Sequence, residues 1–214
     1  MSFHPHQNQR PSLPLLPLKC DSCGDVHINT PDGLVYDFQE FGDFLLSQST
    51  DGSVVLQARQ ERWASYPERP VSVNTAVAMY VGGDKLEFYL KPETSFYVND
   101  VLTDLPTDYV SLPAGGSISG SGSSTDFTIL WPDGNTGARV ILRNDSLDIG
   151  IARLGGSLTY EGVLGNLDGD RMNDIQVRGG ELITPPASLE QLKLFGDSWR
   201  LSAEESLFDA PHGR

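Results

Sequence analysis

The chain has 214 residues, which is enough for one sizeable hydrophobic core and short for two full domains. Its 29 acidic and 15 basic side chains give a formal charge of −14. Because no block of lysine or arginine interrupts this acidic excess, we expect neither nucleic acid nor an anionic membrane surface as a partner. No apolar run reaches the roughly 18 residues that a transmembrane helix needs, so we expect no membrane span.

Residues 1–19 are rich in proline, with Pro5, Pro11, Pro14 and Pro17 spaced along the segment. This spacing favours an extended conformation. The segment lacks the basic-then-apolar order and the small-residue cleavage site of a signal peptide. We therefore expect an extended tail, which is a candidate contact segment for a protein partner.

Cys20 and Cys23 are the two cysteines of the chain, and they exclude a scaffold held by several disulfides. The pair is compatible with a local disulfide, with a redox pair or with half of a metal site. A zinc site would recruit His27, His4 or His6, but no second CxxC or HxxxH motif completes four ligands at a known spacing. We favour a disulfide or free thiols over zinc.

Short alternating runs separated by turn signals begin at Val26. Asp32-Gly33 and Asp51-Gly52 lie between period-two segments, which is typical of β-hairpins. The same pattern continues to Leu154 with about ten strands at roughly 8 to 12-residue spacing and no helical period between them. The sequence therefore predicts an all-β fold, an antiparallel β-sandwich of about ten strands.

Glycine and serine dominate the stretch from Leu112 to Asp126. We predict a mobile loop there, and no domain boundary, because strand patterning resumes on both sides. The domain is therefore expected to span residues 20–208, between the tail 1–19 and a short tail 209–214.

One short C-terminal helix is predicted from capping chemistry. Ser188 followed by Gln191 forms a capping box, and Gly196 is expected to end the helix. Ser202 with Glu205 forms a second box that can open one further turn. The apolar face of the helix is expected to carry Leu189, Leu192 and Phe195.

An acidic loop lies in the segment "EGVLGNLDGDRMNDIQV", from Glu161 to Val177. Hard cations such as Ca²⁺ take six to eight oxygen ligands, and a flexible loop can supply them. An EF-hand is not indicated, because "DGDRMNDIQVRG" lacks the glycine at the sixth place and the final glutamate. The alternative is that these side chains only form turn hydrogen bonds with the backbone. The candidate ligands are Asn166, Asp168, the Asp170 carbonyl, Asn173 and Asp174.

Three separated stretches resemble the von Willebrand factor type D (VWD) domain, in its cysteine-poor form found in membrane mucins and related surface proteins. The first is "CGDVHINTPDGLVYDFQEFGDFLL", residues 23–46, which is similar to the opening strands of the family. The second is "GVLGNLDGDRMNDI", residues 162–175, and the third is "FGDSWRLSAEESLF", residues 195–208. The three stretches occur in the family's order and span most of the chain.

The resemblance implies a β-sandwich in which Ca²⁺ ties the first hairpin to the late acidic loop. It also implies a secreted or cell-surface module that acts without catalysis, through a protein partner or self-assembly. Metal binding in such a site contributes to the free energy of folding. Carried onto this sequence, the implied ligands are Asp32, Asn166, Asp168, Asp170, Asn173 and Asp174.

Two positions depart from the family pattern. Leu164 stands where the family has a cysteine in the calcium loop, which leaves Cys20 and Cys23 with only each other as disulfide partners. Some family members cleave themselves at an Asp-Pro bond, and here Asp25 is followed by Val26. We therefore expect no self-cleavage at this site.

We expect no catalytic activity, because GxSxG, HExxH and comparable motifs are absent from the sequence. His27 lies in an alternating strand and is expected to be a packed or hydrogen-bonded strand residue. Trp63, Trp131 and Trp199 are expected to be core and sheet-face anchors. The alternatives are a specialised enzyme on the same scaffold, since one family relative is a light-emitting oxygenase, and a lipid-binding protein, as among yolk-protein relatives.

Overall fold

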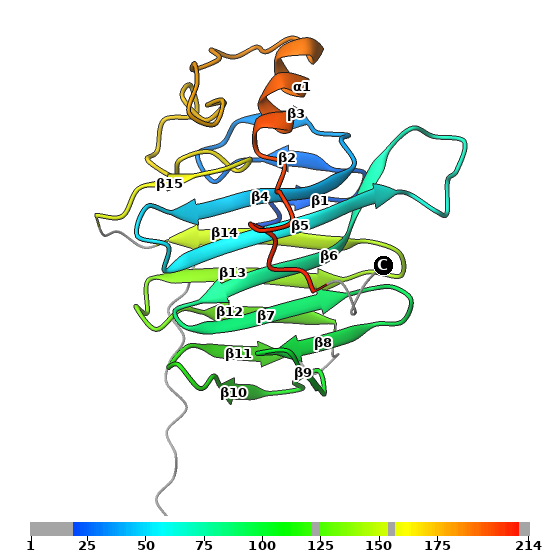
Figure 1. Ribbon diagram of the computed structural model, residues 1–214, viewed down its shortest axis with the longest axis vertical. Coiled ribbons are helices and arrows are strands. Elements are labelled where there is room, and N and C mark those ends of the chain that lie inside the picture. The colour runs from blue at the N-terminus through cyan, green and yellow to red at the C-terminus, as the bar shows by residue number, and fades with distance from the viewer. Residues whose placement is uncertain (1–18, 121–124, 154–156, 210–214) are drawn as a thin grey trace, which may run out of the picture.

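Two antiparallel sheets form the body of the protein in the computed structural model, which describes residues 19–120, 125–153 and 157–209 (Figure 1). The predicted all-β sandwich with a short C-terminal helix is confirmed. Asp32-Gly33 and Asp51-Gly52 lie in hairpin turns, as predicted, and both glycines have a positive φ, +93° and +71°.

The first sheet has eight strands whose order in space departs from their order in the chain. The N-terminal strands join the sheet beside a late strand, because Ser22 pairs with Ile149. In spatial order the strands are β10 (Tyr109–Ser111), β11 (Ser117–Gly120), β12 (Asp126–Leu130), β13 (Thr136–Leu142), β14 (Leu147–Arg153), β1 (Ser22–Cys23), β2 (His27–Asn29) and β3 (Val35–Asp37).

The second sheet has seven strands and contains the longest ones in the described residues. Most of it is a meander of consecutive hairpins, with one late strand added at the edge by the pairing of Tyr160 with Ser49. In spatial order the strands are β15 (Tyr160–Glu161), β4 (Gly42–Ser49), β5 (Val54–Arg62), β6 (Ser72–Val81), β7 (Asp84–Tyr89), β8 (Ser95–Val98) and β9 (Val101–Thr103).

Side chains from both sheets form one hydrophobic core. Phe88 of β7 and Phe127 of β12 meet across the sandwich, with ring centroids 5.4 Å apart. Val77 of β6 and Val140 of β13 are fully buried in the same core. Each such side chain contributes roughly 1.5–3 kcal/mol to stability, so this core is the main source of folding free energy.

Residues 201–209 cross the outer face of the second sheet, where Figure 1 shows the red segment lying over β5 and β6. Gln57 fixes this segment through an N–H donated to the Glu205 carbonyl, at 2.9 Å. Phe208 is buried in a second apolar cluster on this face, and Lys85 Nζ lies 2.8 Å from Asp209 Oδ2. The segment explains why β6 is buried on both of its faces.

Helix α1 (Leu189–Ser198) begins as its capping box predicts. The Ser188 hydroxyl accepts a hydrogen bond from the Gln191 backbone N–H, and the Gln191 side chain accepts one from the Ser188 N–H. Ser202 and Glu205 make the second predicted contact, at 3.0 Å, within a turn.

Two details of the predicted helix are wrong. The helix continues through Gly196 to Ser198, and Gly196 serves packing, because a Cβ there would lie 2.3 Å from the ring of Phe38. Leu189 does not join the buried face, since it lies in the first turn and is 84% exposed.

The predicted loop between Leu112 and Asp126 is also wrong in part, because residues 117–120 form strand β11. Ile118 is buried and pairs with Ile129 of β12. A Cβ at Gly120 would lie 2.0 Å from the Pro106 carbonyl oxygen, so this glycine permits close contact between backbones. The loop residues 121–124 lie outside the described part of the chain. The described residues form 15 strands, more than the ten predicted, because several strands have only two to four residues.

Candidate functional site

The acidic loop is anchored by apolar residues at both of its ends. Val163 and Leu164 are fully buried, and their backbone N–H groups donate to Leu45 and Leu46 of β4, at 3.1 and 2.8 Å. Ile175, at the other end, is 1% exposed. The polar residues between these anchors are therefore held at the end of the sandwich near α1 (Figure 1).

The first hairpin and the acidic loop meet, as the family resemblance implied. Asp32 Oδ2 accepts a hydrogen bond from the Asp168 backbone N–H at 3.0 Å. The Thr30 hydroxyl donates to Asp174 Oδ2 at 2.6 Å, and both of these residues are 1% exposed. Thr30 is absent from the residues predicted from sequence, because a threonine before a proline in a turn carries no specific signal of a contact 144 residues away.

Asn166, Asp168 and Asn173 form a compact hydrogen-bonded group. The side-chain N–H groups of Asn166 and Asn173 donate to Asp168 Oδ2 at 3.1 and 2.9 Å. Asn166 also donates to Asn173 Oδ1 at 3.0 Å. Hydrogen bonds from Asn173 and from the Asp170 backbone N–H lower the pKa of the Asp168 carboxyl, which favours its charged form.

Asp170 accepts hydrogen bonds within the turn through both its side chain and its backbone carbonyl. Its side chain accepts from the Met172 backbone N–H at 2.9 Å. Its carbonyl accepts from the Asn173 backbone N–H at 3.2 Å. A carbonyl oxygen has two lone pairs, so the Asp170 carbonyl keeps acceptor capacity beyond this hydrogen bond.

Asp174 has the most perturbed carboxyl of the acidic loop. Burial raises its pKa to about 6, and the charge of Asp32 adds to the rise, while the Thr30 hydrogen bond and the Asn166 backbone N–H act against it. Asp174 Oδ1 is buried and has no hydrogen-bond partner in the described part of the chain. A buried carboxylate oxygen without a partner is costly, so this position favours a proton, a bound cation or an ordered water.

Gly165 makes room for the Asp174 carboxyl group. A Cβ at Gly165 would lie 2.2 Å from Asp174 Oδ1, and the residue has a φ of +81°. The Gly165 position was not among the residues predicted to form the site. A glycine directly before an asparagine is also common in ordinary turns, so the sequence around Gly165 did not indicate a role in the site.

Four of the six predicted ligands line a cavity of about 540 Å³: Asn166, Asp168, Asn173 and Asp174. Asp32 and Asp170 are not part of its lining. Glu161 of β15, which the sequence did not single out, lines the same cavity. Carboxylate, amide and carbonyl oxygens are the donors that Ca²⁺ prefers. The orphaned oxygen of Asp174 and these donor types fit a hard divalent cation. The carboxylate oxygens of Asp32, Asp168 and Asp174 do not all lie within 4.8 Å of one another, so they would have to draw together around the ion.

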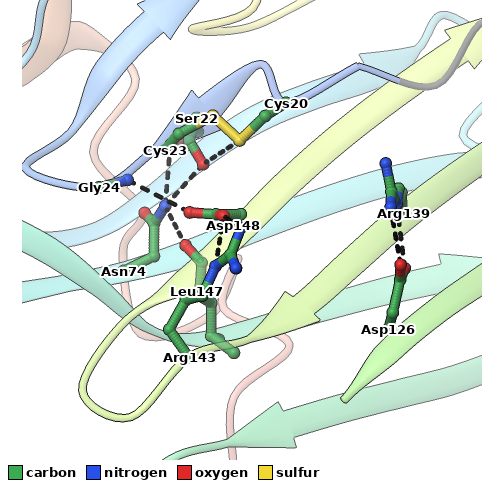
Figure 2. Close-up of polar contacts among 10 residues, drawn as sticks. All are labelled: Cys20, Ser22, Cys23, Gly24, Asn74, Asp126, Arg139, Arg143, Leu147 and Asp148. Atoms are coloured by element: carbon green, nitrogen blue, oxygen red, sulfur yellow. Dashed lines mark hydrogen bonds and ion pairs between the residues drawn. A yellow bond between two sulfur atoms is a disulfide. The ribbon is translucent and has the colours of Figure 1, made fainter. Parts of the chain in front are cut away.

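Cys20 and Cys23 form a disulfide, which is one of the two alternatives that the sequence favoured (Figure 2). Figure 2 shows Asp148 beside the two cysteines, where it accepts hydrogen bonds from the Gly24 backbone N–H and the Arg143 guanidinium. The sulfur atoms of Cys20 and Cys23 lie within 4.8 Å of a carboxylate oxygen of Asp148. Joined as a disulfide, these sulfurs are not the thiolates that a zinc site requires.

His27 is a hydrogen-bonded strand residue, as predicted. Its Nδ1 lies 2.6 Å from Asp37 Oδ1, and its Nε2 lies 3.1 Å from Asp25 Oδ1. The hydrogen bond with Asp37 raises the pKa of His27. Of the three tryptophans, Trp131 and Trp199 are buried as expected, at 3% and 1% exposure, and Trp63 is half-buried with its ring N–H on Asp145.

No family model matches the chain. The chain is similar to Sushi domain-containing protein 2 of Homo sapiens, with 26% identity over 216 residues that cover 94% of this chain. The same match covers 24% of that relative, so the chain spans about a quarter of the relative's length. In the described ranges, no helix has the length and apolar character needed to cross a membrane.

Proposed function

We propose that the chain is a noncatalytic, Ca²⁺-stabilised interaction module of the VWD type that works outside the cell. Ca²⁺ would be held by Asp32, Asn166, Asp168, the Asp170 carbonyl, Asn173 and Asp174. The ion would supply the positive charge that brings the carboxylates of two distant chain segments together, and its role would be structural.

The observation that carries this proposal is the position of Asp174. Its Oδ1 atom is buried without a hydrogen-bond partner in the described residues, at the point where the Asp32 hairpin meets the acidic loop. Ordinary turn chemistry satisfies carboxylate oxygens with backbone N–H groups, as it does at Asp170. The Asn166 backbone N–H favours the charged form of the Asp174 carboxyl, yet Asp174 Oδ1 has no hydrogen-bond partner in the described residues, which supports a cation over the turn alternative.

The ion would also order a surface suited to partner binding. Strand β3 is one of the two outer strands of the first sheet, and Val35 on it is 67% exposed. The β2–β3 hairpin carries Asp32 in its turn, so Ca²⁺ bound there would fix the position of this edge. Exposed edge strands are common sites of pairing with another chain.

Two observations support an extracellular setting. The Cys20–Cys23 disulfide is typical of oxidising compartments. The name of the human relative states that it contains a sushi domain, so this likeness supports a modular setting beside a second kind of domain.

Thermal unfolding in EDTA and in 10 mM CaCl₂ tests the proposal. Sites of this kind in extracellular modules bind with a Kd on the order of 10⁻⁴ to 10⁻³ M, so we expect Ca²⁺ to stabilise the protein by about 1–3 kcal/mol. This corresponds to a rise in Tm of roughly 2–10 °C for a chain of this size. Asp168→Asn and Asp174→Asn should each remove most of this rise.

Glu93→Gln is the matched control, because Glu93 is exposed and lies outside the acidic loop. It changes the net charge by the same amount and should keep the full response to Ca²⁺. A wild-type Tm that is the same in EDTA and in CaCl₂ would refute the proposal. A response that survives both aspartate substitutions would place the ion elsewhere.

A further inference from the structure

A second cavity, of about 690 Å³, lies between the edge strands at the other end of the sandwich. It is lined by residues of β9, the last strand of the second sheet, and of β10, the first strand of the first sheet. Figure 1 shows both strands at the bottom of the view, at the end farthest from α1. The cavity is therefore separate from the acidic loop.

The inner wall of this cavity is apolar. Phe96, Leu112 and Ile118 line it and are buried, at 2%, 5% and 1% exposure. Val101 of β9 and Val110 of β10 line it from the two edges and are 65% and 47% exposed. The three buried residues form the floor of the cavity and the two valines form its exposed sides, and the volume lies in the range of small-molecule sites, roughly 300–1,000 Å³.

The charged residues that line this cavity are all acidic. Among the described residues that line the cavity, Asp104 and Asp108 are the charged ones, and both are exposed. They belong to the segment that connects β9 to β10, so two carboxylates lie at the rim of an apolar cavity. This arrangement attracts a cationic group and repels a carboxylate.

We propose that this cavity binds a small amphiphile with an apolar chain and a cationic head group, of the alkylammonium class. The chain would lie between Val101 and Val110, over the floor that Phe96, Leu112 and Ile118 form, and burial of its apolar surface would supply most of the affinity. The head group would remain at the rim beside Asp104 and Asp108. This activity is independent of the Ca²⁺ site and goes beyond the function proposed above.

Three probes with the same ten-carbon chain test the proposal: decylammonium, decanol and decanoate. Each is titrated into the full chain by calorimetry, below its micelle concentration and in EDTA, so that the Ca²⁺ site plays no part. We expect decylammonium to bind roughly three- to tenfold more tightly than decanol, and decanoate to bind most weakly. Asp104→Asn combined with Asp108→Asn should remove the preference for decylammonium and leave decanol binding unchanged.

A pair of neighbouring residues provides a matched test of location. Val101 and Leu102 are both 65% exposed on β9, but only Val101 lines the cavity, because adjacent side chains of a strand point to opposite faces. Val101→Trp should block the entrance and weaken decylammonium binding at least tenfold. Leu102→Trp adds the same ring to the other face and should leave binding within about twofold.

Several results would overturn the proposal. These are no binding of any probe, decanoate binding as tight as decylammonium, or equal loss in the two tryptophan variants. Sedimentation of the wild type checks the competing occupant, a second copy of the chain. Self-association that Val101→Trp abolishes, without amphiphile binding, would assign this end of the sandwich to a protein interface instead.

Discussion

The Thr30 hydroxyl donates a 2.6 Å hydrogen bond to the Asp174 carboxylate, and this contact joins segments 144 residues apart. The same hydroxyl accepts a hydrogen bond from the Leu34 backbone N–H, which closes the turn of the first hairpin. Thr30 therefore couples the shape of the hairpin turn to the position of the most buried carboxylate in the acidic loop.

Replacing Thr30 with valine should destabilise the protein by about 1–3 kcal/mol, because a hydrogen bond to a buried charged group is lost. A double-mutant cycle of Thr30→Val with Asp174→Asn, measured by urea unfolding in EDTA, should give a coupling energy of about 1 kcal/mol or more. Thr103→Val is the control, because Thr103 is exposed and its hydroxyl bonds locally to the Val101 carbonyl, and should change stability by less than about 0.5 kcal/mol. Strictly additive losses in the cycle would show that the contact does not couple the two segments.

Gly165→Ala and Gly169→Ala separate backbone strain from steric crowding in the acidic loop. Both glycines have a positive φ, +81° and +95°, so alanine is strained at either position by roughly 1–2 kcal/mol. Only Gly165 faces a neighbour, Asp174 Oδ1, whereas a Cβ at Gly169 meets nothing within 4 Å. Urea unfolding should therefore show a clearly larger loss for Gly165→Ala, and calorimetry should show loss of Ca²⁺ binding in that variant. Equal losses would mean that Asp174 moves freely and is not held in place.

Local patterns predicted much of the sandwich. Period-two alternation and Asp-Gly turns predicted the hairpins, because both depend on neighbouring residues along the chain. The capping box at Ser188 predicted the start of α1 for the same reason. The meeting of Asp32 with the acidic loop is a long-range contact, and it was inferred from the family resemblance rather than from a local pattern.

Glycines account for the main errors of prediction. Gly120 and Gly196 were interpreted as a flexible loop position and a helix end, yet both are needed where another group approaches closely. A sequence does not distinguish a glycine chosen for its conformational freedom from one chosen for its small size. The cavity between β9 and β10 was missed because it depends on how the edge strands of two different sheets are placed in space.

Gly196→Ala tests the packing role of this glycine. On an exposed helix surface this change stabilises by about 1 kcal/mol, because alanine has the higher helix propensity. Here the added methyl group would lie 2.3 Å from the buried Phe38 ring, so we expect a net loss of about 1–3 kcal/mol in urea unfolding. Leu189→Ala in the same helix is the control and should have little effect, since Leu189 is 84% exposed. A stabilised Gly196→Ala variant would show that Phe38 can move aside.

Asp21 should make stability depend on pH in a direction unusual for an aspartate. Burial raises its pKa from 3.8 to about 7, against the opposing hydrogen bond from the Ile151 backbone N–H, 2.7 Å from Asp21 Oδ2. Between about pH 4 and pH 7 the folded state retains a proton that the unfolded state has lost. The contribution of Asp21 is therefore fully present below pH 4 and is lost as pH rises toward 7, by up to about 1.4 kcal/mol per pH unit.

Asp21→Asn removes this titration and keeps a side-chain oxygen for the Ile151 N–H. Urea unfolding of the variant and the wild type in EDTA, from pH 4 to pH 8, should give similar stabilities near pH 4. The variant should become the more stable protein as pH approaches 7. Taking the difference between the two proteins cancels the titration of His27 and Asp174, which have raised pKa values as well.

Asp126→Asn is the control. Arg139 lowers the pKa of Asp126, so the contribution of Asp126 to stability is lost only as pH falls below about 4. Parallel curves for Asp21→Asn and the wild type would mean that Asp21 is ionised in the folded protein at pH 5–6, and that its buried charge is compensated there.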